Sequence, residues 1–370
     1  MSDAIQMIVM PKWGLAMQEG MVAQWHVAEG AKITKGQEIV DIETSKIANV
    51  FESPISGTLR RLVVKDGETV PVAYLIGVVA EESVTDAEID AFVEDFKANF
   101  VFDAAGAGGP EPEDATTAAG RIRYLEMGDG EGAPIVFIHG YGGDLNNWMF
   151  NQEELSAGHK TYAVDLPGHG GSTKDVGDMG LRGLAAAVVA FMDTKDIAKA
   201  HLVGHSMGGA TALLLALEQP DRVASATLVA PAALGDEINM DYINGFIEEK
   251  RAKKLRPVLE MLVGDPSLIS KDMVEDVLKF KRLDGVDAAL KKLRDALMPG
   301  GKQAGSLRDG LAGLKVPVQI LWGEVDQVLP VGHSEGLPAS IKVTRFAGVG
   351  HMPHMEKAAE TNELIRALAG

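Results

Sequence analysis

The chain has 370 residues, 46% of them hydrophobic and 24% charged, and its formal net charge is −18. This length predicts two domains of ordinary globular composition, and the negative charge argues against nucleic acid or an anionic membrane as the main partner, because both attract basic surfaces. Since there is no cysteine, disulfides, thiolate nucleophiles and thiolate metal sites are excluded, and any sulfur chemistry must come from a cofactor or a substrate.

Targeting and membrane segments are not evident in the sequence. The N-terminus lacks a basic stretch followed by a long apolar run, so no signal peptide is predicted. The apolar run Ala210 to Leu217 is far too short to cross a bilayer. We therefore expect a cytoplasmic protein.

Residues 1–80 are predicted to form short strands, because apolar residues alternate between glycines and charged turn residues. The segment also contains an internal repeat. A constant shift aligns its two halves in pairs: Gly20 with Gly57, Val27 with Val64, Gly30 with Gly67, Ile33 with Val70, and Ile39 with Ile76. Two such halves predict an all-β flattened barrel or sandwich with pseudo-twofold symmetry.

One lysine, Lys46, stands between the two halves, in the stretch DIETSKIAN. Strand-like residues lead into and out of it, so we expect Lys46 at the exposed tip of a hairpin. An isolated surface lysine is usually only solvated. However, residues 4–80 resemble a lipoyl domain, the swinging carrier of 2-oxo acid dehydrogenase complexes, through DIETSKIANVFESPISGTL, the glycine-bounded repeat and PKWGLAMQEG. The resemblance implies that lipoate is covalently attached at Lys46.

Lipoylation of this lysine would replace its positive charge by an amide and add a dithiolane, the redox-active sulfur that a cysteine-free chain lacks. Glu43 and Thr44 are expected to set the turn and to be read by partner enzymes. A biotin carrier is the near alternative. The methionines that usually flank a biotinylated lysine are missing, because Ser45 and Ile47 occupy those positions.

Residues 84–102 are predicted to be helical. Thr85 and Glu88 form a capping-box pattern, and the apolar residues that recur on one face are Ile89, Phe92, Val93, Phe96 and Phe100. We expect this helix to pack on one of the two domains, with docking of another protein as the alternative. Residues 103–120, rich in alanine, glycine, proline and acids, are expected to be a flexible linker. Residues 81–120 would then connect domains 1–80 and 121–370.

From Arg121 onward, strands alternate with helices, which is the rhythm of a mostly parallel sheet. The predicted strands are Ile135 to Ile138, Thr161 to Val164, His201 to Val203, Thr227 to Val229 and Val318 to Trp322. Helical stretches rich in lysine and glutamate interrupt this alternation from residue 235 to about residue 305. We expect this helical insertion to form a lid over the carboxyl edge of the sheet.

The segment HLVGHSMGG carries the pattern G-x-S-x-G, with Ser206 between Gly204 and Gly208. It follows an apolar strand and precedes a helix, and the two glycines permit the sharp turn that exposes a nucleophilic hydroxyl. Asp326, in GEVDQVLP, and His351, in AGVGHMPHME, follow later strands. This order of serine, acid and histidine is that of α/β-hydrolases, and residues 120–370 resemble that superfamily.

The chemistry of such a site assigns a role to each residue. His351 would remove the proton from the Ser206 hydroxyl, and Asp326 would orient the imidazole and stabilise its cation. The backbone N–H groups of Met207, after the serine, and Tyr141, at the end of a strand, are expected to bind the tetrahedral oxyanion.

Competing assignments involve four residues. Glu324 is an alternative acid and His354 an alternative base, whereas His205 is expected to shape the turn beside the serine. His201 and His205 have a spacing known from metal ligands on helices, but a strand-to-turn segment does not bring them together, so no metal site is expected. The segment GYGG lacks the lysine and the spacing of a phosphate-binding loop.

The combination of carrier and serine site resembles the family of dihydrolipoamide acetyltransferase (E2) components of acetoin dehydrogenase complexes. The resemblance implies an acyltransferase that moves an acetyl group from the lipoyl arm to CoA after acetoin cleavage. It implies a thiamine-diphosphate-dependent enzyme and a flavin-dependent dihydrolipoamide dehydrogenase as partners. The basic run Arg251 to Lys254 could meet the CoA phosphates, although a solvated helix face accounts for it equally well.

Two features depart from ordinary acetyltransferase components. The usual H-x-x-x-D-G motif is absent, and one predicted helix stands where a three-helix partner-binding domain is usual. We expect the serine domain to transfer the acetyl group. A serine esterase or thioesterase with a lipoyl arm is the first alternative, and a non-enzymatic scaffold is the second.

Overall fold

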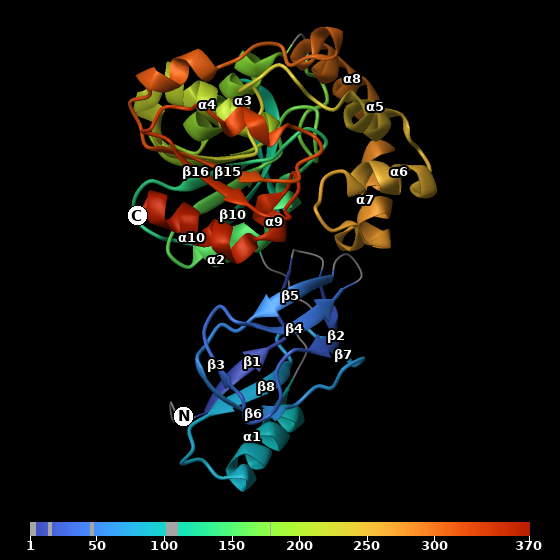
Figure 1. Cartoon of the computed structure of the whole chain (residues 1–370), viewed down its shortest axis with the longest axis vertical. Helices are drawn as coiled ribbons and strands as arrows, with labels where there is room; N and C mark the ends of the chain where they lie inside the picture. The colour runs from blue at the N-terminus through green and yellow to red at the C-terminus, as the bar shows by residue number, and fades with distance from the viewer. Residues whose placement is uncertain (1–4, 14–16, 45–47, 101–109, 178) are drawn as a thin grey trace. The chain divides into compact units, whose positions relative to one another are not determined.

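The computed structural model describes residues 5–13, 17–44, 48–100, 110–177 and 179–370. They form two compact units, the first within residues 5–100 and the second built from residues 110–269 and 274–370 (Figure 1). None of the helices in these described ranges has both the length and the apolar character needed to span a membrane. The cytoplasmic location stays a prediction.

The first unit is a sandwich of two four-stranded antiparallel sheets, with strand orders β1-β8-β6-β3 and β5-β4-β2-β7. Its strands are β1 (Ile5–Val9), β2 (Glu19–Trp25), β3 (Lys32–Ile33), β4 (Glu38–Glu43), β5 (Ala48–Glu52), β6 (Gly57–Leu62), β7 (Thr69–Pro71) and β8 (Leu75–Ala80). Apolar side chains from both sheets, among them Ile8, Val22, Ile42, Leu59 and Ile76, are fully buried between them. The predicted all-β carrier fold is confirmed.

The internal repeat appears in the topology and in the hydrogen bonds. The order β5-β4-β2-β7 maps strand by strand onto β1-β8-β6-β3. The N–H of Gly30 donates to the carbonyl of Leu59, and the N–H of Gly67 donates to that of Val22, each over 2.7 Å. Both glycines have a positive φ, 87° and 84°, which a residue with a side chain rarely adopts. The repeated glycines therefore form equivalent turns in the two halves.

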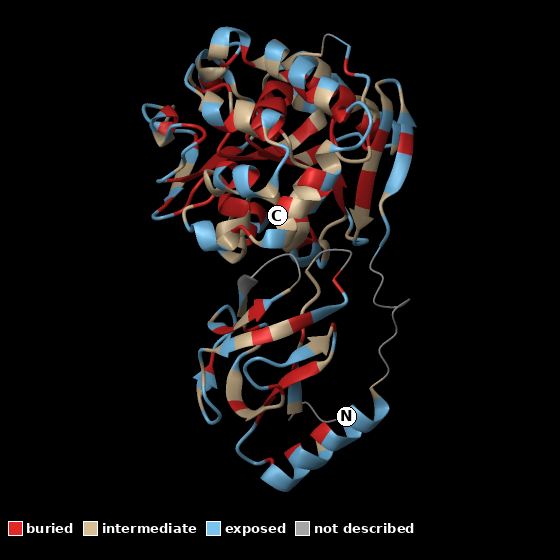
Figure 2. Ribbon diagram, turned by 90° about the vertical axis from the view of Figure 1, so that its right-hand side faces the viewer, coloured by how far each residue is buried: buried red, intermediate tan, exposed pale blue. Residues whose placement is uncertain are grey.

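Helix α1 (Asp86–Asn99) begins at Thr85 with both bonds of the predicted capping box, between Thr85 and Glu88. Ile89 and Val93 are buried against a cluster that includes Leu75 and Val78 of β8, which leaves a short buried stripe on an otherwise exposed helix (Figure 2). The apolar face of α1 is thus covered by the strands of its own unit.

The second unit is built on one eight-stranded sheet with strand order β16-β15-β14-β13-β11-β12-β10-β9. Its strands are β9 (Glu113–Thr117), β10 (Gly120–Met127), β11 (Ile135–Ile138), β12 (Thr161–Val164), β13 (Ala200–His205), β14 (Val223–Val229), β15 (Val318–Gly323) and β16 (Lys342–Phe346). The ladders from β12 to β16 are parallel, whereas β9 and β10 are antiparallel. The predicted, mostly parallel α/β sheet is confirmed.

Helices cover both faces of this sheet. Helices α3 (Leu181–Thr194) and α4 (Met207–Glu218) lie on one face, and α2 (Met149–Ser156), α9 (Pro353–Glu356) and α10 (Ala358–Ala369) lie on the other (Figure 1). Between β14 and β15 the chain forms the helical insertion, with α5 (Met240–Glu248), α6 (Ala252–Glu260), α7 (Lys271–Lys281) and α8 (Val286–Leu297).

The segment expected to be a linker differs in its second half. Residues 113–117 form β9, which pairs with β10 from Thr117 opposite Gly120 to Glu113 opposite Tyr124. This edge strand is mostly polar because its exposed face needs no apolar residues, so composition alone suggested a coil. The linker predicted for residues 103–120 is therefore wrong for residues 113–117, and it stays a prediction for residues 103–109, which lie outside the described ranges.

Candidate active site

Ser206 occupies the tight turn between β13 and α4. Its backbone has φ 52° and ψ −112°, its N–H donates to the carbonyl of Val229, and its own carbonyl accepts from the N–H of Ala232. A positive φ in a residue with a side chain is strained and persists only where the surroundings enforce it.

The two glycines of the motif are required by close packing. A Cβ on Gly204 would collide with the carbonyl oxygen of Gly208, and one on Gly208 would collide with that of Ile138 in β11. The elbow is therefore pressed against the neighbouring strand, and the serine stands at the carboxyl end of the sheet.

His351 and Asp326 form a buried hydrogen-bonded pair. The Nδ1 of His351 lies 2.7 Å from Oδ2 of Asp326, and the two side chains are 2% and 0% exposed. Oδ1 of Asp326 accepts from the N–H groups of Val328 and Leu329, and Oδ2 also accepts from Nε1 of Trp322. The carboxylate is thus held in one orientation, and Nδ1 of His351 carries the proton that Asp326 accepts.

The loop that carries His351 is held from two sides. The N–H of His351 donates to the carbonyl of Leu262 over 2.8 Å. The carboxylate of Glu356 accepts from the N–H groups of Gly350 and Gly264, at 2.9 and 2.7 Å. Burial raises the pKa of the Glu356 carboxyl, and these backbone bonds counteract that rise. The helical insertion therefore contributes backbone contacts to the position of the histidine.

The alternative acid and base do not meet the triad partners. Glu324 is exposed, and its backbone N–H donates to the carbonyl of Phe346. His354 is fully buried between the rings of Trp148 and His205, with centroids 4.5 and 4.7 Å away, and neither of its ring nitrogens has a hydrogen-bond partner. Burial lowers the pKa of His354 to about 3.

His205 connects the elbow to the histidine loop. Its Nε2 donates to the carbonyl of His351 over 2.9 Å, and the two rings lie 4.6 Å apart. Because His205 directly precedes Ser206, this hydrogen bond joins the elbow to the loop that carries His351. Within the described residues the Ser206 hydroxyl itself makes no hydrogen bond to the His351 ring; in free enzymes such bonds often tighten only when substrate binds.

The expected oxyanion donors lie in two buried backbone segments. Tyr141 and Met207 are 6% and 4% exposed, and among the described residues neither backbone N–H has a hydrogen-bond acceptor. Gly140 brings the two segments together, because a Cβ there would lie 3.2 Å from Cβ of Ser206 and 2.7 Å from Nδ1 of His205. Buried amides without acceptors are what an oxyanion site requires before substrate enters.

Two buried histidines that were not assigned a role from the sequence hold the Tyr141 segment. Nε2 of His139 accepts the N–H of Leu166, and Nε2 of His169 accepts the N–H of Gly142, while each Nδ1 donates to a nearby carbonyl. Burial lowers the pKa of His139 to about 4 and that of His169 well below its usual value. Both rings are therefore neutral and can accept these amides. In the sequence, His139 stands in an HG pair at the end of a strand and His169 in the segment DLPGHGGS, and these two patterns could have indicated both histidines.

The surroundings of the site include one apolar cavity of about 210 Å³ beside Met207. Its lining residues come from α3, α4 and the end of the helical insertion and include Leu214, Ala233 and Leu297.

No group of three or more potential metal-ligating side chains was found among the described residues, and Nδ1 of His201 is hydrogen-bonded to the hydroxyl of Ser225.

The predicted carrier lysine, Lys46, lies outside the described residues. The flanking strands are described: β4 and β5 are paired up to Glu43 opposite Ala48, so residues 44–47 connect two antiparallel strands. The attachment of lipoate at Lys46 stays a prediction.

Comparisons with known proteins match both units. A family model described as alpha/beta hydrolase fold matches residues 133–358, and one described as biotin-requiring enzyme matches residues 6–79. A solved meta-cleavage product hydrolase from Pseudomonas fluorescens has a TM-score of 0.63 at 22% identity, over 69% of this chain and 96% of that one. At that identity the likeness shows the fold alone.

Curated relatives match over the whole chain. The dihydrolipoyllysine-residue acetyltransferase component of the acetoin cleaving system of Pseudomonas putida is 44% identical over 98% of both chains. The protein of the same name from Cupriavidus necator is 44% identical over 100% of this chain and 98% of its own. A 2-hydroxy-6-oxo-6-phenylhexa-2,4-dienoate hydrolase from Comamonas testosteroni is 30% identical over 66% of this chain and 89% of its own.

Proposed function

We propose residue roles for a chain that belongs to the family of dihydrolipoyllysine-residue acetyltransferase components of acetoin cleaving systems and, in its second unit, to the α/β-hydrolase-fold family. The chain is an acetyltransferase that passes an acetyl group from a lipoyl carrier to CoA. It works in a multienzyme system, and we propose a thiamine-diphosphate-dependent enzyme and a flavin-dependent dihydrolipoamide dehydrogenase as its partners there. Lipoate, bound at Lys46, supplies the thiol that carries the acetyl group.

The observation that carries the proposal is the buried pair of His351 and Asp326, linked to the strained Ser206 through His205, which bonds to the carbonyl of His351. Asp326 keeps the proton of His351 on Nδ1, which leaves Nε2 free to act as a base. Nε2 takes the proton of the Ser206 hydroxyl as its oxygen attacks the carbonyl carbon of the acetyl thioester. The N–H groups of Met207 and Tyr141 stabilise the resulting oxyanion, each to the extent of about 3 kcal/mol.

The remaining steps transfer the acetyl group to CoA and restore the free serine and histidine. The tetrahedral adduct collapses, the carbon–sulfur bond breaks, and His351 gives its proton to the leaving thiolate, so that Ser206 carries the acetyl group as an ester. The CoA thiol then loses its proton to His351 and attacks that ester. Ser206 leaves as the alkoxide and recovers the proton, and acetyl-CoA is formed.

Water competes with CoA for the acetyl ester, and the helical insertion bears on this competition. The hydroxyl of Tyr141 donates to the carbonyl of Leu290 in α8 over 2.7 Å, and Gly142 packs against Phe246 of α5. We propose that these contacts hold the insertion over the acetyl ester and limit the access of water.

The test is acetyl-CoA formation from S-acetyldihydrolipoamide by the full chain and by Ser206→Ala. We expect the variant to lose nearly all activity. Unchanged activity would remove the serine from the reaction. Rapid release of acetate that does not depend on CoA would instead favour the esterase alternative.

A further inference from the structure

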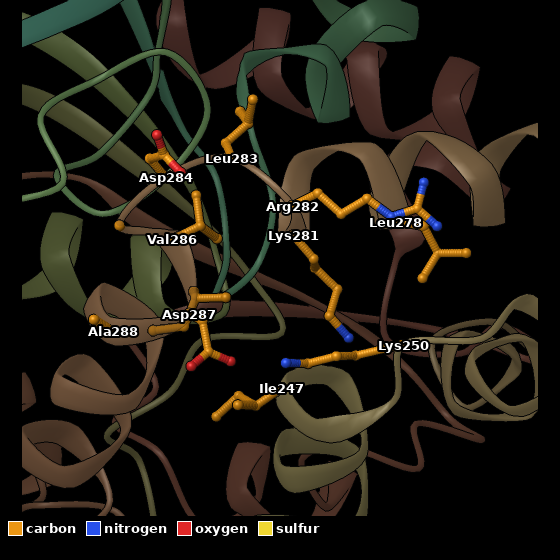
Figure 3. A pocket seen from close by; sticks show the side chains of 12 residues that line it. Ile247, Lys250, Leu278, Lys281, Arg282, Leu283, Asp284, Val286, Asp287 and Ala288 are labelled. Atoms are coloured by element: carbon orange, nitrogen blue, oxygen red, sulfur yellow. The ribbon is translucent and has the colours of Figure 1, made fainter.

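A second cavity, of about 480 Å³, lies within the helical insertion, between the end of α5, the end of α7 and the start of α8. Its walls combine apolar side chains with lysines. Leu278 and Val286 belong to the apolar part, and the side chains of Lys250 and Lys281 extend into the same part of the cavity (Figure 3). Nothing in the acyl-transfer mechanism above uses this cavity.

The charge inside the cavity is positive, in a chain that carries −18 overall. The carboxylate of Asp287 faces the two lysines, but it also accepts a hydrogen bond from Lys291 over 2.7 Å and so balances only part of the charge. Asp284 and Arg282 lie at the rim, and the guanidinium of Arg282 points away from the lysine pair (Figure 3). The three cations among the lining residues, Lys250, Lys281 and Arg282, exceed the two carboxylates, Asp284 and Asp287, by one.

Lys281 is half-buried and lies near a second cation, Lys250. Burial first, and the charge of Lys250 second, lower the pKa of Lys281 to about 8. Its ammonium group donates to the carbonyl of Glu249 and lies 5.4 Å from the centre of the Phe246 ring. A phosphate between the two lysines would accept from both and relieve their repulsion.

The cavity also adjoins the acyl-transfer site. Leu290 lines the cavity, and its carbonyl accepts the hydroxyl of Tyr141; Phe246, under Lys281, packs against Gly142. One layer of side chains thus separates the cavity from the segment that carries an expected oxyanion donor.

We propose that this cavity binds the phosphate groups of CoA, with Lys250 and Lys281 as the cations and the apolar wall, including the 53% exposed Leu283, beside the adenine. The proposal rests on the acetyltransferase function above, which requires CoA as acceptor. The proposal places the phosphates at Lys250 rather than at the basic run Arg251 to Lys254, because none of those four residues lines the cavity.

The test measures binding directly, by calorimetry, with the full chain carrying Ser206→Ala, so that it does not depend on acyl transfer. We expect Lys250→Gln to weaken CoA binding about tenfold, since it removes a charge-assisted bond to phosphate. The matched control is Lys253→Gln, which removes one exposed lysine from the neighbouring helix outside the cavity. It should leave CoA binding unchanged. Adenosine 3′,5′-bisphosphate should compete with CoA, and pantetheine should not.

Kinetics of the chain with Ser206 intact provide a second readout. In Lys250→Gln the KM for CoA should rise with little change in kcat. With pantetheine as the acceptor, KM and kcat of Lys250→Gln should be as close to the wild-type values as those of Lys253→Gln. Equal CoA affinity in Lys250→Gln and the wild type, or equal weakening by Lys253→Gln, overturns the proposal. If Ser206→Ala still transferred acetyl groups, the proposed role of the serine would be wrong. The measured CoA affinities would still test the binding site, because they do not depend on acetyl transfer.

Discussion

The Nδ1 of His351 and the Oδ2 of Asp326 lie 2.7 Å apart, with both side chains almost completely shielded from water. Three further donors, from Trp322, Val328 and Leu329, bind the same carboxylate. Such a site lets the imidazole turn only one nitrogen toward a substrate, and the predictions below depend on that arrangement.

Replacing Asp326 by asparagine should keep the shape of the site but offer His351 a donor in place of an acceptor. The imidazole would then take the wrong tautomer, and kcat for acetyl-CoA formation should fall by about 10³- to 10⁴-fold. The control is Glu324→Gln, since Glu324 is exposed two residues earlier and should be dispensable. Equal losses in the two variants would mean that Asp326 is not the acid of the site.

Gly140→Ala should damage catalysis without touching a reacting group. The added methyl would meet Nδ1 of His205 at 2.7 Å and Cβ of Ser206 at 3.2 Å, so the serine or the Tyr141 segment must shift. A displacement of this size can cost about a hundredfold in rate. Gly158→Ala is the control, because its Cβ would meet no atom within 4 Å. Full activity in Gly140→Ala would show that the two segments are not tightly coupled.

The acid sensitivity of the second unit should depend on His354. Its folded-state pKa, about 3, lies below the usual 6.5, so the unfolded chain takes up the proton first as the pH falls. The stability that this group contributes is fully present above pH 6.5 and is lost progressively toward pH 3, with a slope of up to about 1.4 kcal/mol per pH unit. His354→Leu should remove this contribution to the pH dependence of the free energy of unfolding.

Urea unfolding of the second unit, followed by circular dichroism at several pH values between 7 and 4, measures this slope. At pH 7 the variant should lose little stability, because neither ring nitrogen of His354 gives up a hydrogen bond. A slope identical to that of the wild type would contradict the assignment of a neutral, buried His354.

Lys46→Arg keeps a positive charge but removes the amine that lipoate acylates. The intact mass of the protein should lose its lipoyl addition, and acetyl transfer in the reconstituted complex should stop. The assay with free S-acetyldihydrolipoamide should continue, because it bypasses the carrier. Lys35→Arg, an exposed lysine in another turn of the same unit, is the control and should remain fully lipoylated. A lipoyl mass that persists in Lys46→Arg would place the attachment elsewhere.

Much of the fold was predictable because buried strands and tight turns leave local patterns. The apolar runs 135–138 and 161–164 are strands with those same bounds, since both of their faces are buried. The glycines on either side of Ser206 likewise predict the tight turn. By contrast, β9 is polar and becomes a strand only through its pairing with β10, which no local pattern reveals.

Ser206, Asp326 and His351 could be proposed as a triad from their order along the chain, and the structure pairs His351 with Asp326. The groups that position these residues could not be predicted. His169 accepts the N–H of Gly142, 27 residues away in sequence, and the carboxylate of Glu356 joins Gly350 to Gly264 in the helical insertion. These roles depend on tertiary contacts between distant segments. A histidine or glutamate in the sequence does not indicate which backbone amide it will meet.

The most direct measurement of the central claim is the mass of the Ser206 peptide after the full chain is mixed with S-acetyldihydrolipoamide without CoA and quenched. We predict an acetyl group on Ser206 that disappears when CoA is added, at the rate at which acetyl-CoA forms. In Asp326→Asn this acetyl group should form far more slowly. Acetyl-CoA formation at the full rate with Ser206 unmodified at every time point would contradict it.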